Sequence, residues 1–135
     1  MTERPIILVV EDEYELQAIL DEDLTESGFA PEILSSAEEA LTLFRGRVKE
    51  YRALVADVNL RGRLSGWEIA RQVREKEPTF PVIYTTAASA HEWPSQGVPN
   101  SILLTKPFAP AQLITALSQL LNTGSPEKSM LRPSD

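Results

Sequence analysis

The sequence predicts an α/β fold in which a doubly wound parallel sheet carries helices on both faces. Short apolar runs alternate with helical patterns along most of the chain. In addition, the first of these runs, Ile6 to Val10, is apolar at every position. A strand that is buried on both faces has that composition, whereas a half-exposed strand alternates apolar and polar residues. We therefore expect the sheet to lie between two layers of helices.

Five strands are expected, and their order follows from general rules of parallel sheets. The five runs are 6–10, 31–34, 53–57, 81–86 and 101–105. Crossovers between parallel strands are right-handed, and a sheet of this size most often takes the flavodoxin-like order 2-1-3-4-5. The sequence therefore predicts that the first strand lies in the interior of the sheet, beside the third.

The helices between these strands carry recognisable start and stop signals. Apolar residues repeat at helical spacing after the first strand, as far as Gly28, which fits a helix C-cap. Ser36 and Ser65 each begin a capping-box pattern that opens the second and third helices. The second helix is expected to bury an apolar face, which consists of Ala37, Ala40, Leu41, Phe44 and Val48. Pro110 suits the first turn of the last helix, which has a leucine-rich stripe.

The segment 88–100 and the C-terminus depart from this pattern. Prolines and a glycine interrupt residues 88–100, which predicts one short helical turn followed by a loop. Residues 123–135 are rich in Ser and Pro without periodicity and are expected to form a flexible tail. The whole chain has 135 residues, enough for one ordinary domain, which we expect to span residues 1–122.

Composition excludes several classes of function. The chain has no cysteine, so disulfides and thiolate metal sites are excluded. Its net charge is -7 and its basic residues are scattered, so we expect no direct contact with nucleic acid. It contains no apolar run of membrane-spanning length and no signal-peptide pattern, so we expect no membrane contact and a cytoplasmic location.

Polar residues gather where the predicted strands end. Glu11 and Asp12 follow the first strand, Asp57 ends the third, Thr86 ends the fourth, and Lys106 follows the fifth. Ligands of open α/β sheets bind outside these carboxyl ends, at the point where the strand order reverses. Each residue alone has an ordinary structural explanation, such as a helix cap or a turn. Their occurrence at four strand ends instead predicts a shared site.

The predicted site has the chemistry of phosphoryl transfer to a carboxylate. Three crowded carboxylates repel one another and need a cation, and sparse all-oxygen ligands favour Mg²⁺. Asp57 can act as a nucleophile, while Lys106 and Thr86 share the charge of an arriving phosphoryl group. No histidine lies nearby to serve as a general base, so phosphorylation of an aspartate is favoured over hydrolysis.

At this point the chain resembles the receiver domains of bacterial response regulators, which have a CheY-like fold. The resemblance spans about residues 5 to 122. Four segments carry it in the right order, namely Ile6-Ile7-Leu8-Val9-Val10-Glu11-Asp12-Glu13, Ala56-Asp57-Val58, Pro81-Val82-Ile83-Tyr84-Thr85-Thr86-Ala87 and Lys106-Pro107-Phe108.

The resemblance assigns roles around a magnesium ion and an aspartyl phosphate. It implies that Asp57 is the phosphoacceptor, that Asp12 binds the metal directly and that Glu11 acts through water. It further implies that the backbone carbonyl of Asn59 completes the protein's share of the metal ligands.

Two further residues are expected to act on the phosphoryl group. The resemblance implies that the Thr86 hydroxyl turns toward it and that Lys106 pairs with one of its oxygens. The Lys106-Pro107 bond is typically cis in the family, which is expected to aim the ammonium inward.

Departures from the family pattern concern the output. Leu103 occupies the position of the usual aromatic switch residue, and Arg61 stands where proline is usual in a loop that is one residue longer before Gly66. The fourth helix is broken by prolines, and only the tail follows the fifth helix, so we expect a single-domain receiver without an output domain.

The implied function is to accept a phosphoryl group from a sensor histidine kinase or a histidine phosphotransfer protein. The signal would then pass by contact with a downstream protein that the sequence does not identify, and family analogy allows a homodimer. The chain would catalyse its own phosphorylation and dephosphorylation without turning over a separate substrate.

Three alternatives differ in testable features. A pseudo-receiver would keep the fold as an interaction module without phosphorylation, but it usually lacks the acceptor, an acidic partner or the lysine. A phosphohydrolase of the haloacid dehalogenase kind wants a second carboxylate at the position of Asn59. A flavodoxin needs a Ser/Thr/Gly loop after the first strand, where this chain is acidic.

Overall fold

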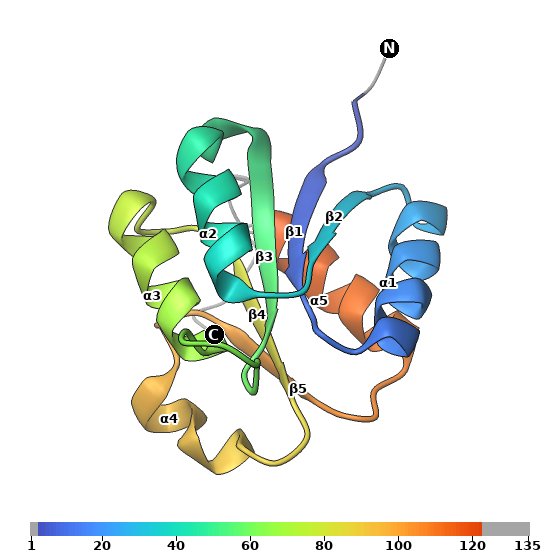
Figure 1. Ribbon diagram of the computed structural model, residues 1–135. Coiled ribbons are helices and arrows are strands. Elements are labelled where there is room, and N and C mark those ends of the chain that lie inside the picture. The colour runs from blue at the N-terminus through green and yellow to red at the C-terminus, as the bar shows by residue number, and fades with distance from the viewer. Residues whose placement is uncertain (1–2, 123–135) are drawn as a thin grey trace, which may run out of the picture.

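A computed structural model of the protein describes residues 3–122, and the expected tail at 123–135 lies outside the described residues. The strands are β1 (Ile6–Val10), β2 (Ala30–Leu34), β3 (Tyr51–Asp57), β4 (Val82–Thr86) and β5 (Ile102–Thr105). They form one parallel sheet in the order β2-β1-β3-β4-β5 (Figure 1). The predicted fold and strand order are confirmed.

Helices cover both faces of the sheet, as predicted. They are α1 (Tyr14–Glu26), α2 (Ala37–Gly46), α3 (Gly66–Lys76), α4 (Trp93–Gln96) and α5 (Pro110–Asn122), with short 3₁₀ turns η1 (Val48–Glu50) and η2 (Ala90–Glu92). Helices α1 and α5 lie on one face, and α2 and α3 lie on the other (Figure 1). Among the described residues, no helix has the length and apolar character that a membrane crossing requires.

Alternate residues of the central strands supply two separate cores. In β1, Leu8 and Val10 pack with α2 and α3, whereas Ile7 and Val9 pack with α1 and α5. All four side chains are buried, which accounts for the uninterrupted apolar run in the sequence. The sheet is thereby fixed between two helical layers.

The predicted helix ends are confirmed in part. At α3 the capping box is complete: the Ser65 hydroxyl accepts from the Glu68 N–H at 3.3 Å and the Glu68 carboxylate accepts from the Ser65 N–H at 2.8 Å. At α2 the expected box was wrong, because the structure shows only its first half, the bond from the Glu39 N–H to the Ser36 hydroxyl. Gly28 follows α1 with φ +96°, which fits its expected role at the helix end.

The apolar face predicted for α2 included one residue, Val48, that lies outside the helix. Ala37, Ala40, Leu41 and Phe44 are buried on the helix, as predicted. Val48 lies beyond it, in η1, because the helix ends at Gly46 and the backbone then turns away. Val48 is partly buried and still packs against the same core, so the apolar pattern indicated its contact with the core but not the helix end.

The segment from Ala90 to Ser101, called the α4 segment below, contains only short helical turns, as its prolines predict. Side chains of α3 hold it in place: the Arg71 guanidinium donates to the carbonyl of Gln96 at 3.1 Å, and that of Arg74 donates to the carbonyl of Pro99 at 2.7 Å. From inside the domain, the hydroxyl of the buried Tyr84 accepts from the Val98 N–H at 3.0 Å.

Candidate functional site

The carboxyl ends of β1 and β3 bring three carboxylates together. Val10 of β1 pairs with Ala56 of β3, so the residues that follow, Glu11 and Asp57, leave the sheet side by side. One carboxylate oxygen each from Glu11, Asp12 and Asp57 lies within 4.8 Å of the others. The convergence that the strand order predicted is therefore confirmed for these acids.

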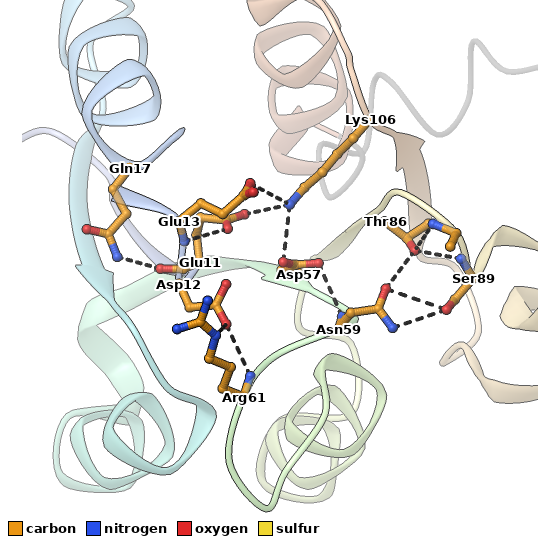
Figure 2. A network of polar contacts seen from close by, with 11 residues as sticks. Glu11, Asp12, Glu13, Gln17, Asp57, Asn59, Arg61, Thr86, Ser89 and Lys106 are labelled. Atoms are coloured by element: carbon orange, nitrogen blue, oxygen red, sulfur yellow. Dashed lines mark hydrogen bonds and ion pairs between the residues drawn. The ribbon is translucent and has the colours of Figure 1, made fainter. Parts of the chain in front are cut away.

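Lys106 enters the same cluster from the loop after β5. Its ammonium donates to Glu11 Oε1 at 3.0 Å and to Asp57 Oδ2 at 3.1 Å, and it lies 3.7 Å from the carboxylate of Glu13 (Figure 2). The Lys106-Pro107 peptide bond is cis, as the family resemblance implies. Lys106 thus links the acids of β1 to the acid of β3.

The two buried carboxylates are held in an unfavourable environment. Glu11 is 1% exposed and Asp57 is 5% exposed. Burial raises the pKa of Asp57, although the charge and hydrogen bond of Lys106 oppose this effect. Burial also raises the pKa of Glu11, and the neighbouring Asp57 charge adds to the increase. Both carboxylates would therefore be stabilised by further positive charge.

The surroundings of Lys106, unlike those of the two acids, favour the charged form of its side chain. Burial disfavours its charge, but the hydrogen bond to Glu11 and the charges of Asp57 and Glu11 outweigh burial and raise the pKa of Lys106. It therefore remains an ammonium at neutral pH. The carboxylates of Glu11, Asp12, Asp57 and the nearby Glu13 face two cations, the Lys106 ammonium and the Arg61 guanidinium, which lies 3.8 Å from Asp12 Oδ2. The cluster therefore keeps an excess of negative charge.

This donor set fits a hard divalent cation. The three acids offer only oxygen atoms, and these are grouped closely enough to bind one ion. A cation at that point would offset the excess charge that the buried acids carry. The residues present are thus suited to a metal ion of the Mg²⁺ type.

Thr86 lies at the rim of the cluster, as expected, but its hydroxyl has other partners. It donates to Asn59 Oδ1 at 3.2 Å and accepts from the backbone N–H groups of Ala88, at 3.3 Å, and Ser89, at 2.9 Å (Figure 2). Among the described residues, no hydrogen bond joins this hydroxyl to Asp57 or Lys106. The structure therefore shows Thr86 turned toward the loop after β3.

Asn59 connects Asp57 to Thr86. Its backbone N–H donates to Asp57 Oδ1 at 3.2 Å, while its side-chain amide binds Thr86 and donates to the Ser89 hydroxyl at 3.2 Å. The predicted role of its backbone carbonyl stays a prediction. Ser89 was not predicted from the sequence. A Thr hydroxyl often accepts from the backbone N–H groups two or three residues later, and this local pattern could have indicated the contact between Thr86 and Ser89.

The loop between β3 and α3 has two further contacts that the sequence did not reveal. The backbone N–H of Arg61 donates to Asp12 Oδ2 at 3.1 Å. The carboxylate of Glu38, on α2, accepts from the backbone N–H groups of Arg63 and Leu64, both at 2.9 Å. Glu38 lies far from this loop in sequence, so no local pattern could have assigned it this role.

Gly66 allows α3 to begin directly against Asp57. A Cβ atom at this position would collide with the carbonyl oxygen of Asp57 and lie 2.9 Å from its carbonyl carbon. These atoms belong to the backbone and cannot move aside cheaply. The first turn of α3 therefore requires glycine in order to pack against the backbone of Asp57.

An aromatic side chain, Tyr84, lies on β4 beside Leu103 of β5. Tyr84 is paired in the sheet with Leu103, the residue at the usual aromatic position, and its ring centre lies 4.6 Å from that of Trp67. Both aromatic side chains are buried, so Trp67 is a packing residue. Leu103 packs against the same core.

Residues 7–118 match the model of the response regulator receiver domain. The chain belongs to this family. The match covers the sheet, the acidic cluster and Lys106, and so it confirms the resemblance drawn from the four sequence segments.

Similar proteins support the assignment as a receiver domain. The transcriptional regulatory protein TcrA of Mycobacterium tuberculosis is 33% identical over 120 residues, which are 87% of this chain and 46% of TcrA. The transcriptional regulatory protein CusR of Escherichia coli is 29% identical over 121 residues, which are 88% of this chain and 52% of CusR. The chain thus spans about half the length of the curated relatives it matches.

Solved structures show the same fold. A response regulator receiver protein from Sinorhizobium medicae is 40% identical, with a TM-score of 0.85 over 89% of this chain and 96% of that one. The chemotaxis protein CheY4 of Vibrio cholerae is 23% identical, with a TM-score of 0.77 over 87% and 98% of the two chains, and confirms the CheY-like fold.

Proposed function

We propose that this receiver domain accepts a phosphoryl group on Asp57 from a phosphohistidine of a sensor kinase or a phosphotransfer protein. The observation that carries the proposal is the position of Asp57, whose Oδ2 lies 3.1 Å from Lys106 Nζ beside the carboxylates of Glu11 and Asp12. A nucleophile, a cation for the phosphoryl charge and a metal-binding donor set thus meet at one point.

The transfer requires no separate base. A carboxylate oxygen of Asp57 attacks phosphorus, a P–O bond forms, and the P–N bond to the donor imidazole breaks. The imidazole nitrogen keeps the electron pair of that bond. Lys106 is placed to neutralise a phosphoryl oxygen, and the backbone N–H of Asn59 holds the other carboxylate oxygen of the acceptor.

The metal site is proposed to use Glu11, Asp12, Asp57 and the backbone carbonyl of Asn59. When bound there, Mg²⁺ supplies positive charge and orients the oxygens of the phosphoryl group. Water then hydrolyses the acyl phosphate: its oxygen forms a bond to phosphorus, and the P–O bond to Asp57 breaks. The Asp57 carboxylate keeps the electron pair of that bond, and inorganic phosphate leaves with the protons of the water, shared with solvent. The domain acts on itself in both steps, and we propose no other substrate.

The signal is proposed to pass through protein contacts in the cytoplasm. The curated relatives are transcriptional regulators that are about twice as long as this chain, so their own activities are not transferred to it. The downstream partner is a protein, and no direct contact with nucleic acid is proposed. The competing function is that of a pseudo-receiver, which binds partners without phosphorylation.

Intact-mass analysis after exposure to acetyl phosphate and Mg²⁺ tests the proposal. The parent protein is expected to gain the mass of one phosphoryl group, and Asp57→Asn is expected to gain none. Asp21→Asn is the matched control, because Asp21 is an exposed acid on α1 away from the cluster, and it should gain the group like the parent. An unmodified parent would favour the pseudo-receiver.

Thermal unfolding tests the metal site separately. Mg²⁺ binds only the native cluster, so saturating Mg²⁺ should raise the melting temperature of the parent. Asp12→Asn should reduce this increase, whereas Asp21→Asn should retain it. Equal melting temperatures with and without Mg²⁺ would contradict the assigned metal ligands.

A further inference from the structure

The Thr86 hydroxyl has a single proton, and its destination is set by its neighbours. Its oxygen already accepts from the N–H groups of Ala88 and Ser89, so the O–H needs an acceptor. Asn59 Oδ1 is that acceptor, at 3.2 Å. Thr86 is fully buried, so water is not at hand to replace this partner. The proton is therefore directed away from Asp57.

Ser89 fixes the amide that receives this proton. The Nδ2 group of Asn59 donates to the Ser89 hydroxyl at 3.2 Å, which leaves Oδ1 facing Thr86 (Figure 2). Ser89 is 8% exposed and also contacts Thr86 through its backbone. The Ser89 hydroxyl also donates to Asn59 Oδ1, at 3.5 Å, so Ser89 contacts both ends of the amide while Thr86 donates to Oδ1 at the shorter distance of 3.2 Å. The amide is thus held between two hydroxyl groups.

We propose that Ser89 is a positioning residue that stabilises the unphosphorylated state by holding Asn59 as the acceptor for the Thr86 proton. This inference rests on the proposed function of Asp57. A phosphoryl group on Asp57 competes with Asn59 for the same proton, because the hydroxyl can donate only once. Whatever stabilises the Asn59 contact therefore opposes the phosphorylated arrangement.

The proposal fixes the direction of a substitution effect. Ser89→Ala removes the acceptor for Asn59 Nδ2, so the amide is free to rotate and Thr86 is released more easily. One hydrogen bond of this kind corresponds to an increase of about two- to tenfold in affinity for a phosphoryl mimic. Mg²⁺ alone does not need the Thr86 proton, so affinity for Mg²⁺ should stay at the parental value.

Calorimetric titration with beryllium trifluoride in saturating Mg²⁺ measures this affinity, because the anion mimics a phosphoryl group on a carboxylate. Ser89→Ala is expected to bind it more tightly than the parent, whereas Ser89→Thr, which keeps the hydroxyl, should bind it as the parent does. Ser101→Ala is the matched control: it removes a serine hydroxyl that binds Trp93 and Val98 outside the site and should not alter the affinity.

A double substitution separates positioning from general loosening. In an Asn59→Ala background the amide is gone, so Ser89→Ala should have no further effect. If Ser89→Ala does not fold, Ser89→Gly removes the same hydroxyl and takes its place in the comparison.

The outcomes distinguish this inference from the proposed function. Parental or weaker binding of beryllium trifluoride by Ser89→Ala, in a parent that binds it, would overturn the role of Ser89 and leave Asp57 as the acceptor. Tighter binding by Ser89→Thr would also overturn it, because that variant retains the hydroxyl. A parent that neither binds the anion nor gains a phosphoryl group would instead contradict the proposed function.

Discussion

Lys106 is bonded to two buried carboxylates, and each of them depends on it for compensation of charge. The side chains of Glu11 and Asp57 are 2% and 6% exposed, so water screens their repulsion poorly. The pKa of both acids is raised above its ordinary value despite the ammonium beside them. The lysine therefore supports the fold as well as the proposed chemistry.

We expect Lys106→Met to lower the free energy of unfolding by about 1–3 kcal/mol, because it leaves buried polar groups without a partner. Urea unfolding at neutral pH without divalent ions measures this loss. Lys49→Met, which removes an exposed lysine of η1, is the control and should change stability little. Asp57→Asn should act in the opposite direction, because it removes one of the repelling charges; a loss of stability in that variant would contradict the assumed repulsion.

Gly66 provides a second test at the level of single residues. Gly66→Ala should destabilise the domain by about 1–3 kcal/mol, since the added carbon meets the backbone of Asp57 and Val58. Gly46→Ala is the matched control, because nothing lies within 4 Å of a Cβ at that glycine. Equal stability of the two variants in urea unfolding would show that α3 can move away from β3 at little cost.

The meeting of the site side chains could be predicted only for residues whose positions follow from the strand order. Asp57 ends β3, and Glu11 and Lys106 follow β1 and β5, so their meeting could be inferred from the predicted strand order without coordinates. The partner of the Thr86 hydroxyl could not be inferred in this way, because that hydroxyl can face either Asp57 or the loop after β3. Side chains from two other segments, Asn59 and Ser89, determine that choice.

Among the elements, α2 and the loop from Val58 to Ser65 are joined by Glu38. Hydrogen bonds from its own backbone N–H and from those of Leu64 and Arg63 lower the pKa of Glu38. A carboxyl group whose pKa is lowered on folding adds stability above its ordinary pKa of 4.5, and this stability is lost as the pH falls through the lowered value. The loop that carries Asn59 and Arg61 is thus anchored in a pH-dependent way.

Glu38→Gln is expected to reduce stability at neutral pH, and the difference from the parent should shrink as the pH falls below 4.5. Urea unfolding of both proteins across this range measures the effect. Glu39→Gln is the matched control, because Glu39 lies in the same first turn of α2 but is exposed. A difference that is independent of pH would mean that the Glu38 charge does not hold the loop.

The elements themselves were predicted more accurately than their ends. Apolar runs located all five strands, and the prolines correctly indicated short helical turns in the α4 segment. The end of α2 was missed because Val48 continues the apolar spacing while the backbone has already left the helix. Periodicity reports which side chains face the core, and a residue can pack against the core after its helix has ended.

At the scale of the domain, the sheet separates two cores, and among residues 3–122 no buried residue belongs to both. Ile69 on α3 and Leu117 on α5 are fully buried on opposite sides. Since the strands belong to both cores, we expect the domain to unfold in a single transition. A destabilising substitution in one core should nevertheless leave the packing of the other core unchanged.

Ile69→Val should cost about 0.5–1.5 kcal/mol and Leu117→Ala about 2–5 kcal/mol. In the double variant these losses should add to within about 0.5 kcal/mol, because the sites lie on opposite faces of the sheet. Urea unfolding followed by circular dichroism and by tryptophan fluorescence measures both points. Two separate transitions would contradict the expected single transition, and a large departure from additivity would show that the two cores are energetically coupled.

The α4 segment is attached to α3 through its main chain, so the attachment does not depend on the identity of its exposed side chains. The guanidinium groups of Arg71 and Arg74 bind main-chain carbonyls of the segment, and every amino acid carries such a carbonyl. Exposed residues of the segment, His91 and Ser95 among them, can therefore be exchanged without releasing its backbone from α3. We expect lineages to diverge at these positions, so that a new binding specificity can arise by point substitution on an unchanged framework.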